Sequence, residues 1–243
     1  MKALTIAKYE TLSDLNSWVA LVFLLIFPLI FTGTIVLILP KGDQSRLIFL
    51  VTGTMNTYML MYAAMNATMT LIERRQSGVL RRIFIMPVSK LEFLAGKSLG
   101  ILGQVGVQVA IMVGLLLFFG LEMHGSWLAF CVVMLLLMLF AITLGVLVST
   151  LARSLTVALL IMMAVINPLI LLSGTWLPAA YLRDNLGEII QVNPLYQALT
   201  ALSKIAVNGA GLADVVLELV IVLAYILLLG GLAVYLYEKK VTA

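Results

Sequence analysis

The chain has 243 residues, of which 63% are hydrophobic and only 11% are charged. Soluble domains carry roughly 25% charged residues, so this composition excludes a soluble globular protein. The formal net charge of +4 is by itself compatible with nucleic-acid binding. The single cysteine, Cys131, excludes a disulfide within the chain and a cysteine-based metal site.

Residues 2–17, ahead of the first long hydrophobic run, have an amphipathic pattern. Drawn as a helix, the segment carries its apolar side chains on one face: Leu4, Ala7, Leu12 and Leu15. Such a helix lies in the membrane interface, so we expect an interfacial amphipathic helix here. The alternative is a polar leader without stable structure, because short amphipathic patterns are weak signals.

Six hydrophobic runs then follow along the chain, at residues 18–39, 47–72, 93–121, 126–151, 154–172 and 215–237. Each approaches or exceeds the ~20 residues that a helix needs to cross a bilayer. Helices satisfy their own backbone hydrogen bonds in lipid, and short breaks between runs make neighbouring helices antiparallel. The sequence therefore predicts an all-α integral membrane protein with six transmembrane helices in a single domain, residues 1–243.

The basic residues are distributed unequally between the two sides of these spans. With the N-terminus in the cytoplasm, eleven of the 15 Lys and Arg residues lie on the cytoplasmic side. Cytoplasmic loops carry an excess of Lys and Arg, so we expect a multi-pass protein of the inner (cytoplasmic) membrane with both termini inside. This asymmetry explains the positive charge without nucleic acid as a partner.

The connection between the second and third runs, residues 73–97, carries six basic residues. Pro87 disfavours a helical conformation at Met86, and Ser89 with Glu92 has the spacing of a capping box. The pattern predicts a short basic helix, a turn and a new helix start on the cytoplasmic face, where a soluble partner could dock. The alternative is a basic loop that only sets the topology.

Polar side chains recur at helical spacing within the second and fifth runs, although polar groups at membrane depth are costly. We interpret one set as a candidate substrate pathway: Thr52, Asn56, Met59, Asn66, Thr70, Met163 and Asn167. The alternative is hydrogen bonding between helices without a role in transport. That alternative is favoured for Gln104 and Gln108, which lie beside small residues that permit close helix contact. These small residues are Gly96, Gly100 and Gly103.

Residues 173–214, between the fifth and sixth runs, form the longest segment on the outer side. The start of this segment is apolar but is broken by Gly174 and Pro178, and residues 182–192 have the composition of a short helix. Irregular backbone at membrane depth needs protein or water around it. We therefore expect a partly re-entrant hairpin followed by a short interfacial helix; the alternative is a solvated loop.

The sequence predicts no enzyme site. Gly96-Lys97-Ser98 resembles part of a phosphate-binding loop, but such a loop needs a glycine five residues before Gly96, where Leu91 stands. His124, the only histidine, lies in a short outer turn, which favours neither a metal site nor histidine catalysis. We expect that the chain binds no cofactor or metal and takes its energy from elsewhere.

Several short motifs, in a consistent order over nearly the whole chain, resemble those of the ATP-binding-cassette (ABC) type-2 permease family. After the second run these motif residues are Glu73, Gly78, Pro87, Val88, Ser89, Gly96 and Lys97. Before the last run they are Ser173, Gly174, Pro178, Asn193, Pro194 and Leu195, and the first run adds Phe27 and Pro28.

This resemblance implies the membrane subunit of a bacterial exporter: a homodimer or heterodimer of permeases docked on two copies of a cytoplasmic ABC ATPase subunit, which holds ATP and Mg²⁺. In such a permease, the ATPase-coupling residues here would be Glu73, Gly78, Arg81, Arg82, Pro87, Val88 and Ser89. The second and fifth spans would line the central path. An outer gate would comprise Ser173, Gly174, Trp176, Pro178, Asn193 and Pro194.

The short outer loops and apolar interior favour a hydrophobic or amphipathic cargo, such as a drug, an antimicrobial peptide or a lipid-like molecule. One alternative is a gradient-driven secondary transporter or channel. Such proteins usually need acids or bases inside the membrane, and the deepest candidate here is Glu218, near the end of the last run. The other alternative is a membrane sensor or assembly subunit that transports nothing.

Overall fold

The computed structural model describes residues 7, 8, 11, 21–38, 44–78, 90–118, 120, 123–176 and 179–241. Every regular element within these residues is helical, which confirms the prediction of an all-α chain. In chain order, the elements are η1 (Val22–Ile26), α3 (Phe27–Ile38), α4 (Gln44–Gln76), α6 (Lys90–Phe118), α7 (Trp127–Leu151), α8 (Leu155–Leu171), α9 (Ala179–Val192), α10 (Pro194–Asn208), η2 (Ala213–Val215) and α11 (Val216–Val241).

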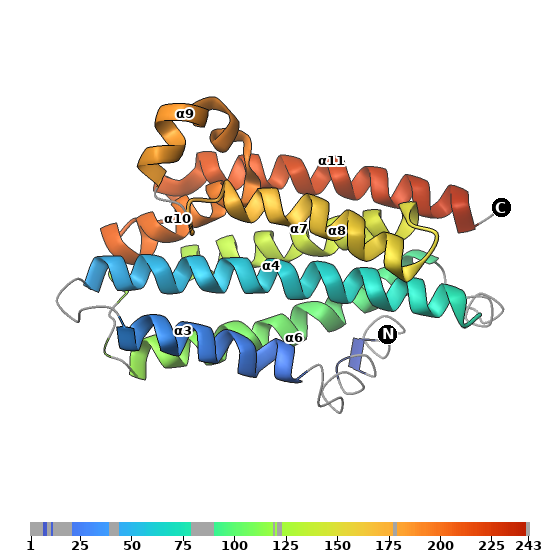
Figure 1. Cartoon of the computed structure of the whole chain (residues 1–243), viewed down its shortest axis with the longest axis horizontal. Coiled ribbons are helices and arrows are strands. Elements are labelled where there is room, and N and C mark those ends of the chain that lie inside the picture. The colour runs from blue at the N-terminus through green and yellow to red at the C-terminus, as the bar shows by residue number, and fades with distance from the viewer. Residues whose placement is uncertain are drawn as a thin grey trace.

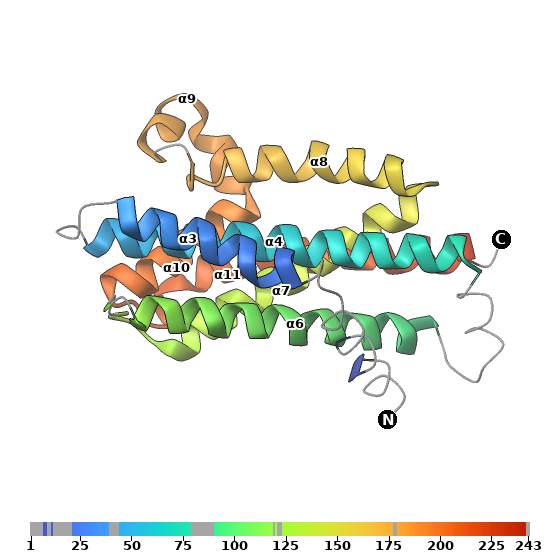
Figure 2. The same cartoon turned by 60° about the horizontal axis from the view of Figure 1, so that its bottom comes forward.

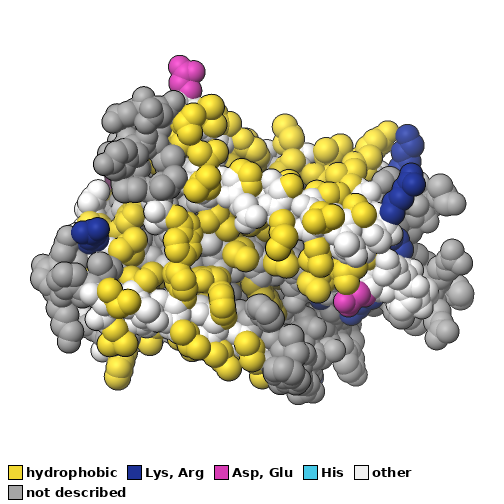
Figure 3. Space-filling view, in the orientation of Figure 1, with side chains coloured by type: hydrophobic (Ala, Val, Ile, Leu, Met, Phe, Trp, Pro, Cys, Tyr) yellow, Lys and Arg dark blue, Asp and Glu magenta, His cyan; other side chains and the backbone are white. Residues whose placement is uncertain are grey.

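The long helices run lengthwise beside one another, and α4 lies between α6 and α8 in both views (Figures 1 and 2). Helix α7 packs along both α4 and α11. We call the end of the bundle where α4 begins and α10 lies the α10 end. The opposite end, where α4 ends and α6 begins, is the loop end. Hydrophobic side chains cover much of the middle of the face drawn in Figure 3.

Within the described residues, each of the six predicted hydrophobic runs contains a helix. Four helical segments are long and apolar enough to cross a membrane: Gln44–Gln76, Glu92–Phe118, Trp127–Leu151 and Ala213–Leu236. Two further apolar helices, Leu24–Ile38 and Leu155–Leu171, are shorter. A helix of 17 residues is about 26 Å long, slightly less than the hydrocarbon core of about 30 Å. Among the described residues, the count of six spans therefore stays a prediction.

The contact between α4 and α7 is a close approach of two backbones. A Cβ atom at Gly145 would lie 2.4 Å from the Ala64 carbonyl oxygen and 2.7 Å from the Ala67 Cβ. The Thr68 hydroxyl donates a hydrogen bond across the same contact to the Gly145 carbonyl, at 3.1 Å. Small residues allow helices in membranes to pack this closely. Helices α4 and α7 thus form the tightly packed centre of the bundle.

Helix α10 is the main departure from the sequence-based description of residues 173–214. The short helix expected at residues 182–192 falls within α9, but the sequence interpretation did not include α10. Asn193 caps α10, since its side chain accepts from the Leu195 N–H at 2.9 Å, and Gly209 ends it with a φ of 73°. Ten of its 15 residues are buried, and it packs against α4, α7 and α11. A solvated loop over these residues is thus excluded.

Most of the interfacial helix expected over residues 2–17 lies outside the described residues. The described Thr11 hydroxyl is within hydrogen-bond distance of two carbonyls, that of Ala7 at 2.9 Å and that of Gly100 at 3.3 Å. Gly100 belongs to the small-residue face of α6, where Gly96 is also buried. The Thr11 hydroxyl thus lies against the small-residue face of α6, where a Cβ atom at Gly103 would be 3.7 Å from it.

Candidate functional site

The predicted coupling segment begins at the last turn of α4, at the loop end. Glu73 is exposed there, and its carbonyl accepts from the Ser77 N–H at 2.8 Å. Gly78 ends the helix in the left-handed region with a φ of 73°, a conformation that favours glycine. Five predicted coupling residues lie outside the described residues: Arg81, Arg82, Pro87, Val88 and Ser89.

Two neighbouring arginines bind this end of α4 to two different helices. The Arg74 guanidinium carbon lies 5.6 Å from the centroid of the Phe93 ring, at the start of α6. Arg75 instead donates to the backbone carbonyls of Ser149 and Ala152, at the end of α7. From the sequence alone, both arginines counted only among the positive charges that set the orientation in the membrane. No local pattern identifies a contact with residues so far along the chain.

The half of the α4 polar face nearest the α10 end is buried within the chain. Thr52, Asn56 and Met59 are each at most 1% exposed. The Asn56 side-chain N–H donates to the Leu195 carbonyl of α10 at 3.2 Å, while its Oδ1 has no partner among the described residues. The Thr52 hydroxyl hydrogen-bonds within its own helix, to the Ile48 carbonyl at 2.8 Å. Asn56 thus joins α4 to α10, and all three side chains are buried within the chain.

Nearer the loop end, the polar residues of α4 face α6 in what we call the Gln104 cluster: Tyr62, Asn66, Thr70 and Gln104. The Tyr62 hydroxyl donates to Gln104 Oε1 at 3.0 Å, and Asn66 Nδ2 donates to the same oxygen at 3.3 Å. The Thr70 hydroxyl lies 3.4 Å from Asn66 Oδ1. Gln104 is fully buried, whereas the three residues of α4 are partly exposed. The cluster therefore joins two helices and also borders accessible space.

The two predicted path residues of α8 lie on the exposed side of that helix. Met163 is 59% exposed and Asn167 is also exposed, whereas Ala158, Met162 and Ile166 face the bundle. Within one copy of the described chain, Met163 and Asn167 are therefore not brought together with the buried residues of α4. A shared path would require a second chain or a rearrangement.

Most of the predicted gate residues lie near the C-terminal end of α8. The buried Ser173 hydroxyl lies 2.9 Å from the Thr175 hydroxyl, and Gly174 has a φ of 84°. Asn193 reaches back to the same end of α8, because its Nδ2 donates to the Leu169 carbonyl at 2.8 Å. Pro194 follows Asn193 as the first residue of α10, and Pro178 lies outside the described residues.

Trp176, which is exposed, borders an open apolar pocket of about 320 Å³ between α3, α4 and residues 175–176. Its ring lies 5.2 Å from that of Phe31, measured between centroids. The pocket is lined by Phe31, Thr34, Ile35, Ile38, Leu50, Thr54, Thr175 and Trp176. Sequence reasoning missed the α3 and α4 residues, because their apolar side chains are indistinguishable from lipid-facing ones until the helices are placed.

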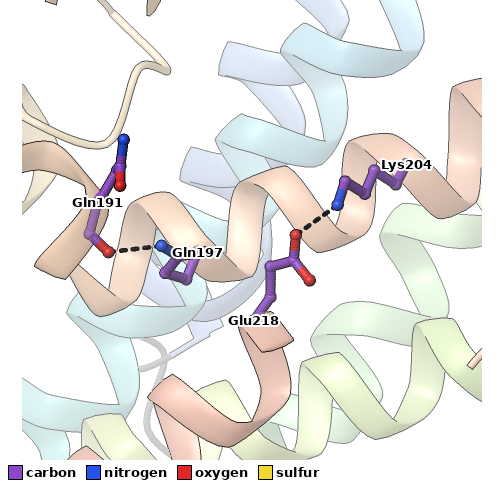
Figure 4. Close-up of polar contacts among 4 residues, drawn as sticks. All are labelled: Gln191, Gln197, Lys204 and Glu218. Carbon is purple, nitrogen blue, oxygen red and sulfur yellow. Dashed lines mark hydrogen bonds and ion pairs between the residues drawn. The ribbon is translucent and has the colours of Figure 1, made fainter. Parts of the chain in front are cut away.

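An ion pair joins α10 to the start of α11 at the α10 end (Figure 4). Lys204 Nζ lies 2.6 Å from Glu218 Oε1. The Glu218 residue is 5% exposed, while the Lys204 side chain is 41% exposed. Sequence reasoning identified Glu218 as the deepest acid but not its partner, because α10 itself was missed.

The turn between α6 and α7 packs on α10 through backbone atoms. The His124 and Ser126 N–H groups donate to carbonyls of residues 206 and 210, at 3.2 and 3.4 Å. A Cβ atom at Gly125 would lie only 2.2 Å from the Ile205 carbonyl oxygen, so the turn requires glycine there. Across the described ranges, no three His, Cys, Asp or Glu side chains are grouped closely enough to hold a metal ion.

Comparison with known proteins identifies one family. The family model described as ABC-2 family transporter protein matches residues 39–235, which run from the start of α4 through most of α11. A search of curated proteins finds no match. The matched range contains all the predicted coupling, pathway and gate residues.

Proposed function

Since the chain belongs to the ABC-2 family of transporter proteins, it is a multi-pass membrane protein of the ABC permease type, and we propose that it is the membrane subunit of an ATP-driven exporter. The observation that carries this proposal is the family match over residues 39–235. A separate ATPase subunit would supply the energy, and the permease itself would have no enzyme activity.

The proposed topology has six spans in one domain. The protein would lie in the inner (cytoplasmic) membrane with both termini in the cytoplasm. The four long apolar helices account for α4, α6, α7 and α11, and α3 and α8 would be the remaining spans. With this orientation the loop end is cytoplasmic, in keeping with its excess of Lys and Arg. The α10 end is then the outer face.

The ATPase would dock on the coupling segment, residues 73–89, and ATP with Mg²⁺ would be held by that partner. Two features of the described residues support this docking site. Glu73 is exposed at the loop end, and Gly78 turns the chain out of α4 at the point where the basic segment begins. Arg74 and Arg75, just before Gly78, contact α6 and α7, respectively. A displacement of the coupling segment would therefore act on both helices.

The proposed transport unit contains a second permease copy and two ATPase subunits. The exposed side of α8, with Met163 and Asn167, would face the second copy across a central path. The partly exposed residues of the Gln104 cluster would border the same path from α4. Thr52, Asn56 and Met59 would contribute only if neighbouring helices moved away from α4, because all three are buried within the chain and Asn56 is bonded to α10.

The proposed cargo is a hydrophobic or amphipathic molecule, such as a drug, an antimicrobial peptide or a lipid-like compound. The pocket beside Trp176 supports this class, since aromatic and aliphatic side chains with a few hydroxyls line it. Ser173, Gly174 and Asn193 would act with Trp176 as the outer gate. Their hydrogen bonds join the end of α8 to the start of α10, so opening would separate these two helices.

A transport assay tests the proposal. The permease and the ATPase that co-purifies with it are reconstituted in liposomes, and ATP-dependent movement of a fluorescent hydrophobic dye is measured. Gly78→Pro should abolish transport, because proline cannot adopt the φ of 73° at this position. Replacing Arg81 and Arg82 with Glu should weaken ATPase binding, whereas Arg46→Glu, at the opposite end of α4, should not.

The other outcomes contradict the proposal in different ways. Dye movement by the permease alone, driven by a proton or sodium gradient, would indicate a secondary transporter. A bound ATPase without any ATP-dependent transport would indicate a sensor or assembly subunit. Unimpaired transport by Gly78→Pro and by the Arg81 and Arg82 variant would refute the assignment of the coupling segment.

A further inference from the structure

The Arg75 guanidinium donates hydrogen bonds to two backbone carbonyls at the loop end. Arg75 lies in the last turn of α4 and is half-buried. One guanidinium nitrogen, Nη1, donates to the Ser149 carbonyl at 3.2 Å, and the other, Nη2, donates to the Ala152 carbonyl. Both acceptors lie at the C-terminal end of α7, more than 70 residues along the chain.

The chemistry of this contact suits arginine in particular. The last carbonyls of a helix have no N–H partner within the helix, and the end of the helix carries partial negative charge. A planar guanidinium can donate to two such carbonyls at once, whereas an ammonium is a compact charge on a flexible stem. Arg75 therefore fixes both the position and the orientation of the last turn of α7.

A short turn connects the end of α7 to the start of α8. Ala152 is extended and Ser154 caps α8, so only residues 152–154 separate the two helices. Helix α8 buries only three of its 17 residues, Ala158, Met162 and Ile166. Because few side chains of α8 are buried, its placement depends on how its two ends are held: the turn at its start and the Asn193 hydrogen bond near its C-terminal end.

Arg75 itself lies at the start of the proposed coupling segment. Arg75 is three residues before Gly78, where the chain leaves α4. Nearer the middle of α4, the backbones of α4 and α7 are in close contact, because Gly145 packs against the backbone of Ala64. The contact through which a displacement of the last turn of α4 would reach the start of α8 is that of Arg75 with Ser149 and Ala152.

We propose that Arg75 is a positioning residue that transmits movement of the coupling segment to the turn between α7 and α8, and so to α8. This inference rests on the proposed function. It assigns Arg75 a role beyond that of a positive charge that sets the membrane orientation. A lysine would set the orientation equally well. This role also distinguishes Arg75 from Arg74, which contacts α6.

The test compares Arg75→Lys and Arg75→Ala with Lys239→Ala, which removes one positive charge from the C-terminal part of α11. Each permease is purified with its ATPase and reconstituted in liposomes, and ATP-dependent dye transport and ATPase co-purification are measured. Thr156, exposed in the first turn of α8, is replaced in a Cys131→Ser background, and the Thr156→Cys variant is labelled with a maleimide with and without ATP. The labelling rate reports movement at the start of α8.

We expect both Arg75 variants to retain the ATPase but to lose transport by at least about fivefold, the lower range of couplings between distant sites. Labelling at position 156 should respond to ATP in the unmodified permease and in Lys239→Ala, but not in the Arg75 variants. If Arg75→Ala does not fold, the charge-conserving Arg75→Lys decides the question.

Two results would overturn the inference. One is unimpaired transport by Arg75→Lys together with an intact ATP response at position 156. The other is loss of the folded permease in Arg75→Lys as well, which would make the contact purely structural. An unmodified permease with no ATP-dependent transport would instead refute the proposed function itself, so the two failures are distinguishable.

Discussion

The two ends of the bundle are held together by different means. At the α10 end, backbone packs on backbone: the turn at Gly125 lies against the carbonyls of α10, and the buried Glu218 is paired with Lys204. At the loop end, the side chains of Arg74 and Arg75 span the distances between α4 and its neighbours. Close backbone contact tolerates little adjustment, whereas long side chains can follow a moving helix. The difference indicates that α10 is held firmly against the Gly125 turn and α11, whereas the loop end is suited to transmitting movement.

The largest effect is expected at Gly125. In Gly125→Val, the new Cβ would meet the Ile205 carbonyl at 2.2 Å, and no side-chain rotation can relieve a clash with backbone. We expect a loss of about 3 kcal/mol or more of stability, the upper range for overpacking. Thermal unfolding of the detergent-purified permease measures it. Gly231→Ala, where an added Cβ has nothing within 4 Å, is the control; equal stability of both variants would contradict the close contact.

The ion pair should respond asymmetrically to removal of either partner. Lys204→Met leaves the buried Glu218 carboxylate uncompensated, and partial exposure of Lys204 reduces the cost to about 2 kcal/mol. Glu218→Gln keeps an acceptor for a lysine that water can also reach, so it should cost only about 1 kcal/mol. Thermal unfolding compares the two, and adding Glu218→Leu to Lys204→Met should restore most of the stability. Equal losses would indicate that burial of Glu218 is unimportant.

The Gln104 cluster offers a smaller test, nearer the loop end. Gln104→Leu removes the acceptor for Tyr62 and Asn66, and interhelical hydrogen bonds in membranes average about 0.6 kcal/mol each, so about 1 kcal/mol should be lost. Gln108→Leu is the matched variant on the same helix, because the buried Gln108 Oε1 has no partner in the described chain. It should cost less or stabilise the protein. Unfolding in the same detergent ranks the two variants, and the reverse order would refute the assignment.

The smallest effect is expected for Arg74. Its contact with Phe93 is of the cation–π type, which is worth about 0.5–1 kcal/mol at partly exposed sites. Arg74→Gln should therefore lower stability only slightly. A double-mutant cycle with Phe93→Leu measures the interaction directly, and a coupling energy near zero would show that the two side chains do not stabilise each other.

Hydropathy located most helices of the bundle, because a helix lets a long apolar run satisfy its own backbone hydrogen bonds in lipid. The exception was α10. Its amphipathic sequence is typical of a surface helix, and its burial depends on the grooves that α4, α7 and α11 provide. The candidate site divides in the same way. The resemblance to the permease family placed Glu73 and Gly78 at the start of the predicted coupling segment, whereas the partners of Arg75, Gln104 and Glu218 lie on other helices.

The sequence by itself determined that this protein is helical, crosses the membrane several times and resembles a transporter subunit, since composition, charge asymmetry and local motifs carry that information. Only the tertiary structure decided which polar side chains pair within the bundle. It separated the single polar face expected on α4 into a half buried beneath α10 and a half that faces α6. The physical reason is that a helix face is defined by residue spacing, whereas the environment of that face is defined by the neighbouring helices.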